Sequence, residues 1–187
     1  MRDLKRILDV AAAAGLLLLL APLFAVLSWI VRRSSPGPAF FRQQRVGLGL
    51  TPFLLLKFRS MCVDAPQKGS WSTAPDDPRI TPVGRFLRRT SLDELPQLLN
   101  VLCGDMSLVG PRPDVPAQMS LYTDEERRLR HSVRPGLTGW AQVNGRNDVS
   151  IERRKELDLE YARRPSLRLD LRILYLTLRQ LLSRRSY

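Results

Sequence analysis

The pattern of apolar and polar positions begins with a long apolar run near the start of the chain. Residues 10–31 carry no charge over about 22 positions, which is long enough for a helix to cross the hydrocarbon core of a membrane. The run is apolar on every side, unlike the single apolar stripe of a helix that packs on a soluble core. It is also too long for a signal peptide. We therefore expect a retained membrane helix over residues 1–34.

Two features of this segment bear on how it enters the membrane. Pro22 lies near the middle of the run and removes a backbone hydrogen bond, which predicts a break at Ala21-Pro22. Both flanks are basic, and the positive-inside rule places both on the cytoplasmic side. The flanking charges are Arg2, Lys5, Arg6, Arg32 and Arg33. The favoured interpretation is a re-entrant helix broken at Pro22, and the alternative is a kinked helix that spans the bilayer.

The rest of the chain predicts an α+β fold that is mainly helical. Two β-prone runs flank Gly47-Leu48-Gly49 and predict a β-hairpin. Residues 62–82 are rich in Pro, Asp, Ser and Gly, which predicts a loop. Helical patterns follow, separated by Gly- and Pro-rich turns. We expect residues 35–187 to form one integrated, compact unit with no second domain.

The helical pattern near the C-terminus is amphipathic. In the last segment, Arg168, Arg172 and Arg179 share one face and leucines lie opposite. Such helices either pack their apolar face on the core or rest as interfacial helices on an anionic bilayer surface. The N-terminal membrane segment makes the second arrangement more plausible, and both stay open here.

Composition narrows the kinds of partner. The chain has 187 residues, a net charge of +12 and a sequence pI near 10.9. This balance indicates an anionic partner: nucleic acid, a membrane surface or a phosphorylated substrate. The sequence contains no recognised nucleic-acid-binding motif, so we expect no nucleic-acid partner. Cys62 and Cys103 have no metal-binding spacing, and His131 is the only histidine.

Two adjacent acids in "TSLDELPQLLN" are the strongest candidates for chemistry. Ser91 and Glu94 match a capping box, a common structural role for this pattern. Pro96 would then fall inside the first turns and lack a hydrogen-bond donor. Either that first turn is distorted, or the regular helix begins near Pro96. At a loosened, positive helix entrance, Asp93 and Glu94 would be ionised, as suits a nucleophile or an Mg²⁺ ligand.

Several longer segments occur together in the same order as in one bacterial enzyme family. They are "FRQQRVGL", "KFRSM", "RRTSLDELPQLLNVLCGDMSLVGPRP", "RPGLTGWAQVNGR" and "LDLEY". The chain resembles the bacterial sugar transferases, or monotopic polyprenol-phosphate phosphoglycosyl transferases, from about Leu4 to Leu182. The block from Leu92 to Pro113 is the most specific part. The small members of this family combine a catalytic domain with one re-entrant N-terminal helix.

The resemblance implies an activity, a cofactor and partners. Members transfer a phospho-sugar from a UDP-sugar to a polyprenol phosphate such as undecaprenyl phosphate, with Mg²⁺ and a covalent aspartyl intermediate. The products are a polyprenol diphosphate sugar and UMP, the first membrane step of bacterial glycoconjugate assembly. The implied location is the bacterial inner (cytoplasmic) membrane, among membrane lipids, with the catalytic domain on the cytoplasmic face. The oligomeric state is open, a homodimer included, and neither the sugar nor the pathway is specified.

Carried onto this chain, the resemblance also implies residue roles. Asp93 would be the nucleophile and an Mg²⁺ ligand, and Glu94 its catalytic partner. Arg112, between two prolines, would bind a substrate phosphate. Lys57 would lie near the acids, and Arg146 on the nucleotide side. Two alternatives stay open: a hydrolase that passes the sugar phosphate to water, and a membrane-associated scaffold without activity.

Overall fold

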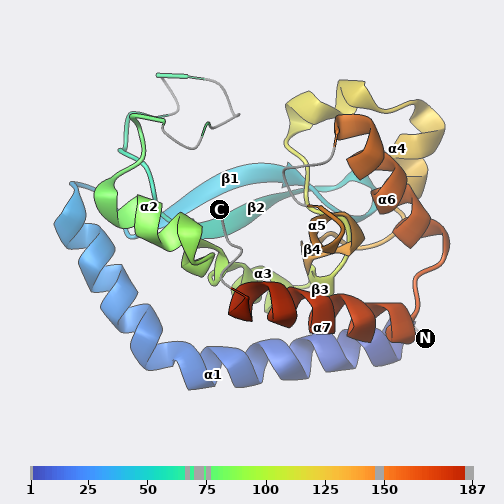
Figure 1. Ribbon diagram of the computed structural model, residues 1–187, viewed down its shortest axis with the longest axis horizontal. Coiled ribbons are helices and arrows are strands. Elements are labelled where there is room, and N and C mark those ends of the chain that lie inside the picture. Colours follow the sequence, from blue (N-terminus) through green and yellow to red (C-terminus); the bar gives the residue numbers. More distant parts are fainter. Residues whose placement is uncertain (1, 66–67, 70–73, 75–76, 146–149, 184–187) are drawn as a thin grey trace.

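The computed structural model describes residues 2–65, 68–69, 74, 77–145 and 150–183 (Figure 1). The helices are α1 (Arg2–Ser34), α2 (Pro82–Arg89), α3 (Gln97–Cys103), α4 (Asp124–Arg130), α5 (Trp140–Val143), α6 (Ile151–Arg163) and α7 (Leu167–Leu182). The strands are β1 (Phe40–Val46), β2 (Pro52–Phe58), β3 (Ser107–Val109) and β4 (Gly136–Thr138), and 3₁₀ turns occur at η1 (Leu48–Leu50), η3 (Leu92–Glu94) and η4 (Pro116–Leu121). The expected mainly helical fold with a hairpin is confirmed.

The strands form two separate pairs. β1 and β2 are antiparallel, with Phe40 opposite Phe58 and Val46 opposite Pro52. Their connection contains Gly49 at φ 60°, a left-handed conformation that glycine adopts readily. The second pair, β3 with β4, is parallel and was not predicted. Each of these strands has only three residues, too few to show an alternating pattern.

The N-terminal helix α1 has the expected extent but is less interrupted than expected. It runs from Arg2 to Ser34 with Pro22 inside it, so its secondary structure is not broken at the proline. Figure 1 shows instead that α1 changes direction part-way along its length, with one arm beside α7 and the other rising toward α2. A proline bends a helix in this way because it removes one hydrogen bond while the neighbouring turns persist.

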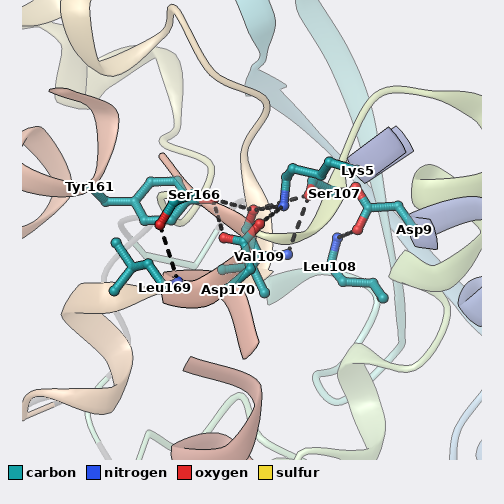
Figure 2. A network of polar contacts seen from close by, with 9 residues as sticks. All are labelled: Lys5, Asp9, Ser107, Leu108, Val109, Tyr161, Ser166, Leu169 and Asp170. Carbon is teal, nitrogen blue, oxygen red and sulfur yellow. Dashed lines mark hydrogen bonds and ion pairs between the residues drawn. The ribbon is translucent and has the colours of Figure 1, made fainter. Parts of the chain in front are cut away.

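The first turns of α1 dock on the rest of the fold through a polar network, which Figure 2 shows. The Lys5 ammonium donates to Asp170 of α7 at 2.7 Å and to the Val109 carbonyl at 3.1 Å. Asp9 is 5% exposed and accepts from the Ser107 hydroxyl at 2.7 Å and the Leu108 amide at 3.2 Å. A buried charge is tolerated only when it has such partners. The network therefore fixes the start of α1 against β3 and α7.

The far end of α1 docks on the same unit. Arg59 is buried and its guanidinium donates to the carbonyl of Val31 in the last turn of α1 and to those of Ser35 and Pro36 just after the helix. The carbonyls at a helix end have no partner within the helix, so these contacts satisfy them. Val31 also packs in a buried cluster with Phe58 and Leu87. Both ends of α1 are therefore held by one folded body.

Between its docked ends, α1 leaves most of its apolar surface uncovered. Leu18 is 80% exposed and Leu19 is 75% exposed. By length and composition, this is the one helix among the described residues that could cross a membrane. Helix α7 also exposes apolar side chains, with Leu171 at 67% and Leu178 at 60%. Large exposed apolar surfaces of this kind indicate contact with a membrane or another protein.

Tyr161 offers a test of the network in Figure 2. It is 1% exposed, and its hydroxyl hydrogen-bonds Asp170 at 2.7 Å and the Val109 carbonyl at 3.1 Å. Tyr161→Phe should lower the free energy of unfolding by about 1–3 kcal/mol, because Asp170 loses a buried partner. Chemical denaturation of the detergent-solubilised protein measures this. The matched control is Tyr175→Phe at a site 64% exposed, where no change is expected. Equal stability of the two variants would contradict the role of the network.

Candidate active site

The acidic pair lies in the connection between α2 and α3. At Ser91 the backbone is left-handed, with φ 57°, and the 3₁₀ turn η3 (Leu92–Glu94) follows. The Ser91 side chain makes no capping hydrogen bond, so the capping-box interpretation is wrong. Helix α3 begins at Gln97, directly after Pro96. The alternative, a regular helix that begins near the proline, is confirmed.

Neighbouring residues fix this turn relative to the hairpin. Leu92 and Leu95 pack on the cluster that contains Phe58. The buried amide of Asn100, in α3, accepts from the Leu56 amide at 3.0 Å and donates to the Leu54 carbonyl at 2.8 Å. This side chain replaces a strand partner along the edge of β2, since it satisfies one donor and one acceptor of that strand. Strand β2 and the acidic turn are therefore held in register.

Glu94 is paired with two cations that come from different segments. Its Oε1 lies 2.8 Å from the Lys57 ammonium in β2 and 2.6 Å from the Arg112 guanidinium. Burial by itself would raise the pKa of Glu94, but the charges of Arg112 and Lys57 and their hydrogen bonds outweigh it and lower this pKa below its ordinary value. Glu94 is therefore ionised across the physiological range.

Asp93 lies beside Glu94 but has a different environment. It is 6% exposed, and burial raises its pKa, against the lowering effect of Lys57 and with a further raising effect from Glu94. Arg88 and Arg112 are further cations near enough to act on this carboxyl. Two adjacent acids whose pKa values are pushed in opposite directions are typical of a site that assigns them different roles.

The turn that carries Arg112 is held by its carbonyl oxygens. Gly136 donates to the Pro111 carbonyl at 2.9 Å and Val46 donates to the Asp114 carbonyl at 3.0 Å. The two carbonyls in between accept hydrogen bonds from arginine side chains. Arg130 donates to the Arg112 carbonyl and Arg45 donates to the Pro113 carbonyl, each at 2.7 Å. Gly136 is required here because an added Cβ would lie 2.1 Å from the Gly110 nitrogen.

The structure brings together four of the residues expected at the site: Lys57, Asp93, Glu94 and Arg112. Arg146, expected on the nucleotide side, lies outside the described residues. Sequence reasoning missed the roles of Arg45 and Arg130, because in so basic a chain nothing local distinguishes them from surface arginines. Burial reveals them: Arg130 is 3% exposed, and burial together with the charge of Arg112 lowers the pKa of Arg45 to about 10.

The carboxylates of the described site could hold a magnesium ion only together with oxygens from a substrate. Among the described residues, no three His, Cys, Asp or Glu side chains group together as a complete metal cage. Mg²⁺ typically needs only one or two carboxylates when substrate phosphates supply further oxygens. Glu94 is already neutralised by two cations, so Asp93 is the carboxylate that could hold such an ion.

Three cations, Lys57, Arg88 and Arg112, act on the carboxyl of Asp93, so the surroundings of the two acids carry an excess of positive charge. The bacterial sugar transferase family matches residues 1–184. The chain belongs to this family of transferase enzymes.

Individual relatives support this assignment. The chain is 49% identical to the uncharacterized sugar transferase EpsL of Bacillus subtilis, over 96% of this chain and 87% of EpsL. It is 48% identical to the UDP-glucose:undecaprenyl-phosphate glucose-1-phosphate transferase of Escherichia coli, over 94% of this chain and 39% of that protein. It is 41% identical to the UDP-N-acetylgalactosamine-undecaprenyl-phosphate N-acetylgalactosaminephosphotransferase of Aeromonas hydrophila, over 96% and 44% respectively. The chain thus spans less than half of the latter two relatives.

Isosteric substitutions should separate the two acids by their effect on stability. At neutral pH, Asp93→Asn removes a buried charge whose pKa is raised, so the thermal midpoint should stay the same or rise. Glu94→Gln leaves Lys57 and Arg112 without their counter-charge and should lower the free energy of unfolding by about 1–3 kcal/mol. Calorimetry of the two purified variants beside the parent measures both effects.

The sign of the pH dependence provides an internal control for Asp93. Its pKa in the folded state lies above the ordinary value of 3.8, so the folded state binds more protons and its stability falls as pH rises through that interval. Any gain in stability from Asp93→Asn should be complete at pH values above the folded-state pKa of Asp93, and absent at pH values below its ordinary pKa. A gain that persists undiminished at the acid end would contradict the raised pKa.

Proposed function

We propose that the chain transfers a phospho-sugar from a UDP-sugar to a polyprenol phosphate such as undecaprenyl phosphate, and releases UMP. The observation that carries the proposal is the buried Asp93 beside a Glu94 that is clamped by Lys57 and Arg112. The names of the Escherichia coli and Aeromonas hydrophila relatives support a UDP-sugar donor and an undecaprenyl phosphate acceptor. The two names give different sugars, glucose and N-acetylgalactosamine, so family membership does not specify the sugar that this chain would transfer.

In the first step, a carboxylate oxygen of Asp93 attacks the sugar-bearing phosphorus of the donor. The bond from this phosphorus to the bridging oxygen breaks, UMP leaves with that oxygen, and an aspartyl phospho-sugar forms. Burial favours this step, because the carboxylate gives up its localised charge when it forms the new bond. The same burial raises the pKa of Asp93.

In the second step, a phosphate oxygen of the polyprenol phosphate attacks the same phosphorus. The bond to Asp93 breaks, the carboxylate is restored, and the polyprenol diphosphate sugar leaves. Arg112 suits a phosphate because its planar fork matches two oxygens at once. Glu94 remains ionised and keeps Arg112 and Lys57 beside the reacting carboxylate. Mg²⁺, when held by Asp93 and the diphosphate, would neutralise charge on the leaving UMP.

We extend the proposal to the membrane, where α1 is re-entrant. Lys5 and Asp9 near one end of the helix and Val31 near the other contact the same folded unit, which favours both ends on one side of the bilayer. The exposed leucines between them would lie among lipid tails. Helix α7, with Leu171, Tyr175 and Leu178 exposed, would rest at the interface with its arginines near anionic headgroups. A location on the cytoplasmic face of the inner membrane would give the site access to a soluble UDP-sugar and a lipid phosphate.

Turnover of defined substrates tests the activity. The purified protein with Mg²⁺, undecaprenyl phosphate and a panel of UDP-sugars should release UMP and form a lipid-linked sugar with at least one donor. Asp93→Asn should lower the rate by at least about 10³-fold, as expected when a nucleophile is removed from a site whose parts act together. Release of UMP with free sugar phosphate and no lipid product would indicate the hydrolase instead. A folded Asp93→Asn variant with full activity would exclude Asp93 as the nucleophile.

Topology is tested by labelling engineered cysteines. Asp3→Cys and Ser34→Cys, each in a background with Cys62→Ser and Cys103→Ser, place a thiol at either end of α1. A membrane-impermeant maleimide should label both positions in inverted vesicles and neither in spheroplasts. Labelling of one end from outside the cell would restore the spanning helix.

A further inference from the structure

Backbone hydrogen bonds can hold the Pro111-Arg112-Pro113 turn mainly through its carbonyl oxygens. Both prolines lack a backbone N–H, so the turn has few donors with which to join a sheet or helix. From Pro111 to Asp114, four consecutive carbonyls each accept a hydrogen bond from a different segment. Two of the donors are backbone amides, and the other two are the side chains of Arg130 and Arg45.

Arg130 is held rigidly before it reaches the turn. It ends α4 and is 3% exposed. Its Nε and Nη2 donate to Asp158 of α6 at 3.1 and 2.7 Å, and its Nη1 pairs with Asp114, directly after the turn. The ring of Tyr122 lies 5.2 Å from the guanidinium. One side chain thus contacts the turn both at the Arg112 carbonyl and at the Asp114 carboxylate.

Arg45 reaches the turn from a different element, strand β1. The amide oxygen of Gln43 orients its guanidinium, at 3.2 Å from Nε and 2.6 Å from Nη2. Its Nη1 then donates to the Pro113 carbonyl at 2.7 Å. Arg45 is also close enough for its charge to act on Arg112, so the two cations tolerate one another only because Glu94 and Asp114 are nearby.

The side chain of Arg112 depends on this support. It is 42% exposed, so packing alone does not restrict its rotamers, and a long exposed side chain otherwise samples many of them. The Cα that carries this side chain lies between the carbonyls of Pro111 and Arg112, and the Pro113 carbonyl follows; all three accept a hydrogen bond. A shift of this backbone by about 1 Å would move the guanidinium away from Glu94, a displacement that commonly costs about 10²-fold in a positioned site.

We propose that Arg130, with Asp158 and Asp114 as its counter-charges, and Arg45 are positioning residues that hold Arg112 at the donor diphosphate. The inference rests on the proposed function in one respect, namely that Arg112 contacts a phosphate of the donor. Beyond that function, two arginines that are not neighbours of the acidic pair position Arg112, because they donate to the main-chain carbonyls of its turn.

A double-mutant cycle in binding tests the inference without catalysis. All variants carry Asp93→Asn, so that no turnover occurs, and the Kd of UDP with Mg²⁺ is measured by titration calorimetry. Arg130→Lys keeps the charge but loses the fork, and should raise this Kd about 10-fold. Arg112→Ala should raise it at least as much. When the two are combined, the Kd should stay within about 2-fold of that of Arg112→Ala alone, because Arg130 acts through Arg112.

Arg127→Lys is the matched control. Arg127 lies on the same helix and also donates to carbonyls, those of Met119 and Tyr122, but not to the turn. Its replacement should leave the Kd of UDP within about 2-fold of the parent. A similar loss with Arg127→Lys and Arg130→Lys would show a general effect of α4 and overturn the inference.

Other outcomes are equally decisive. A folded Arg130→Lys variant that binds UDP as tightly as the parent overturns the inference, and so do losses that multiply in the double variant. If Arg130→Lys does not fold, Arg45→Lys replaces it in the cycle, and the same changes in the Kd of UDP support or overturn the inference. If the Asp93→Asn parent itself does not bind UDP with Mg²⁺, the cycle is run on the chain that keeps Asp93, which can still hold the ion. Absence of UDP binding there as well would show that the proposed function fails, and this inference with it.

Discussion

The pairing of Glu94 with Lys57 and Arg112 is the interaction on which the geometry of the site depends. It joins β2, the η3 turn and the turn after β3, which are distant in sequence. Without this carboxylate the two cations would repel each other in a partly buried region, where Coulomb interactions are stronger than in water. The same pairing keeps Glu94 charged, and its charge helps to raise the pKa of the adjacent Asp93. One ion-pair cluster therefore sets the positions of the acids and keeps Glu94 ionised, while burial is the main cause of the raised pKa of Asp93.

The same constraint on buried polar groups explains how α1 joins the rest of the fold. Lys5 and Asp9 lie in the first turns of α1, just before its long apolar run, and each is satisfied by groups of the folded unit. At the other end, Arg59 donates to the Val31 carbonyl in the last turn of α1 and to the Ser35 carbonyl just after it. In a membrane these groups would have no water to replace such partners. The need of buried polar groups for partners therefore explains why α1 docks at both ends, where its polar residues lie, and leaves its apolar middle exposed.

The arginines of this chain show how composition can mislead. The net charge of +12 indicates an anionic partner, and the cations around Asp93 fit that interpretation. Several other arginines, however, act as donors to backbone carbonyls inside the protein. Arg6 binds carbonyls at the end of α3, as does Arg134, and Arg59 does so at the end of α1. A cation at a helix C-terminus satisfies free carbonyls and the helix dipole together, so part of the basic excess is structural.

Local patterns in the sequence determined the elements whose signals are contained within a few turns of chain. The apolar run of α1, the hairpin and the helix that starts at Pro96 could all be predicted, because periodicity, glycines and prolines act on nearby backbone. The tertiary structure alone decided that Glu94 turns to Lys57 and Arg112 instead of capping its own helix, that β3 pairs with β4, and that Arg130 and Arg45 hold the Arg112 turn. The reason is physical: these contacts join residues far apart in the chain, and burial, which gives a charge or a carbonyl its need for a partner, arises only when those distant segments pack together.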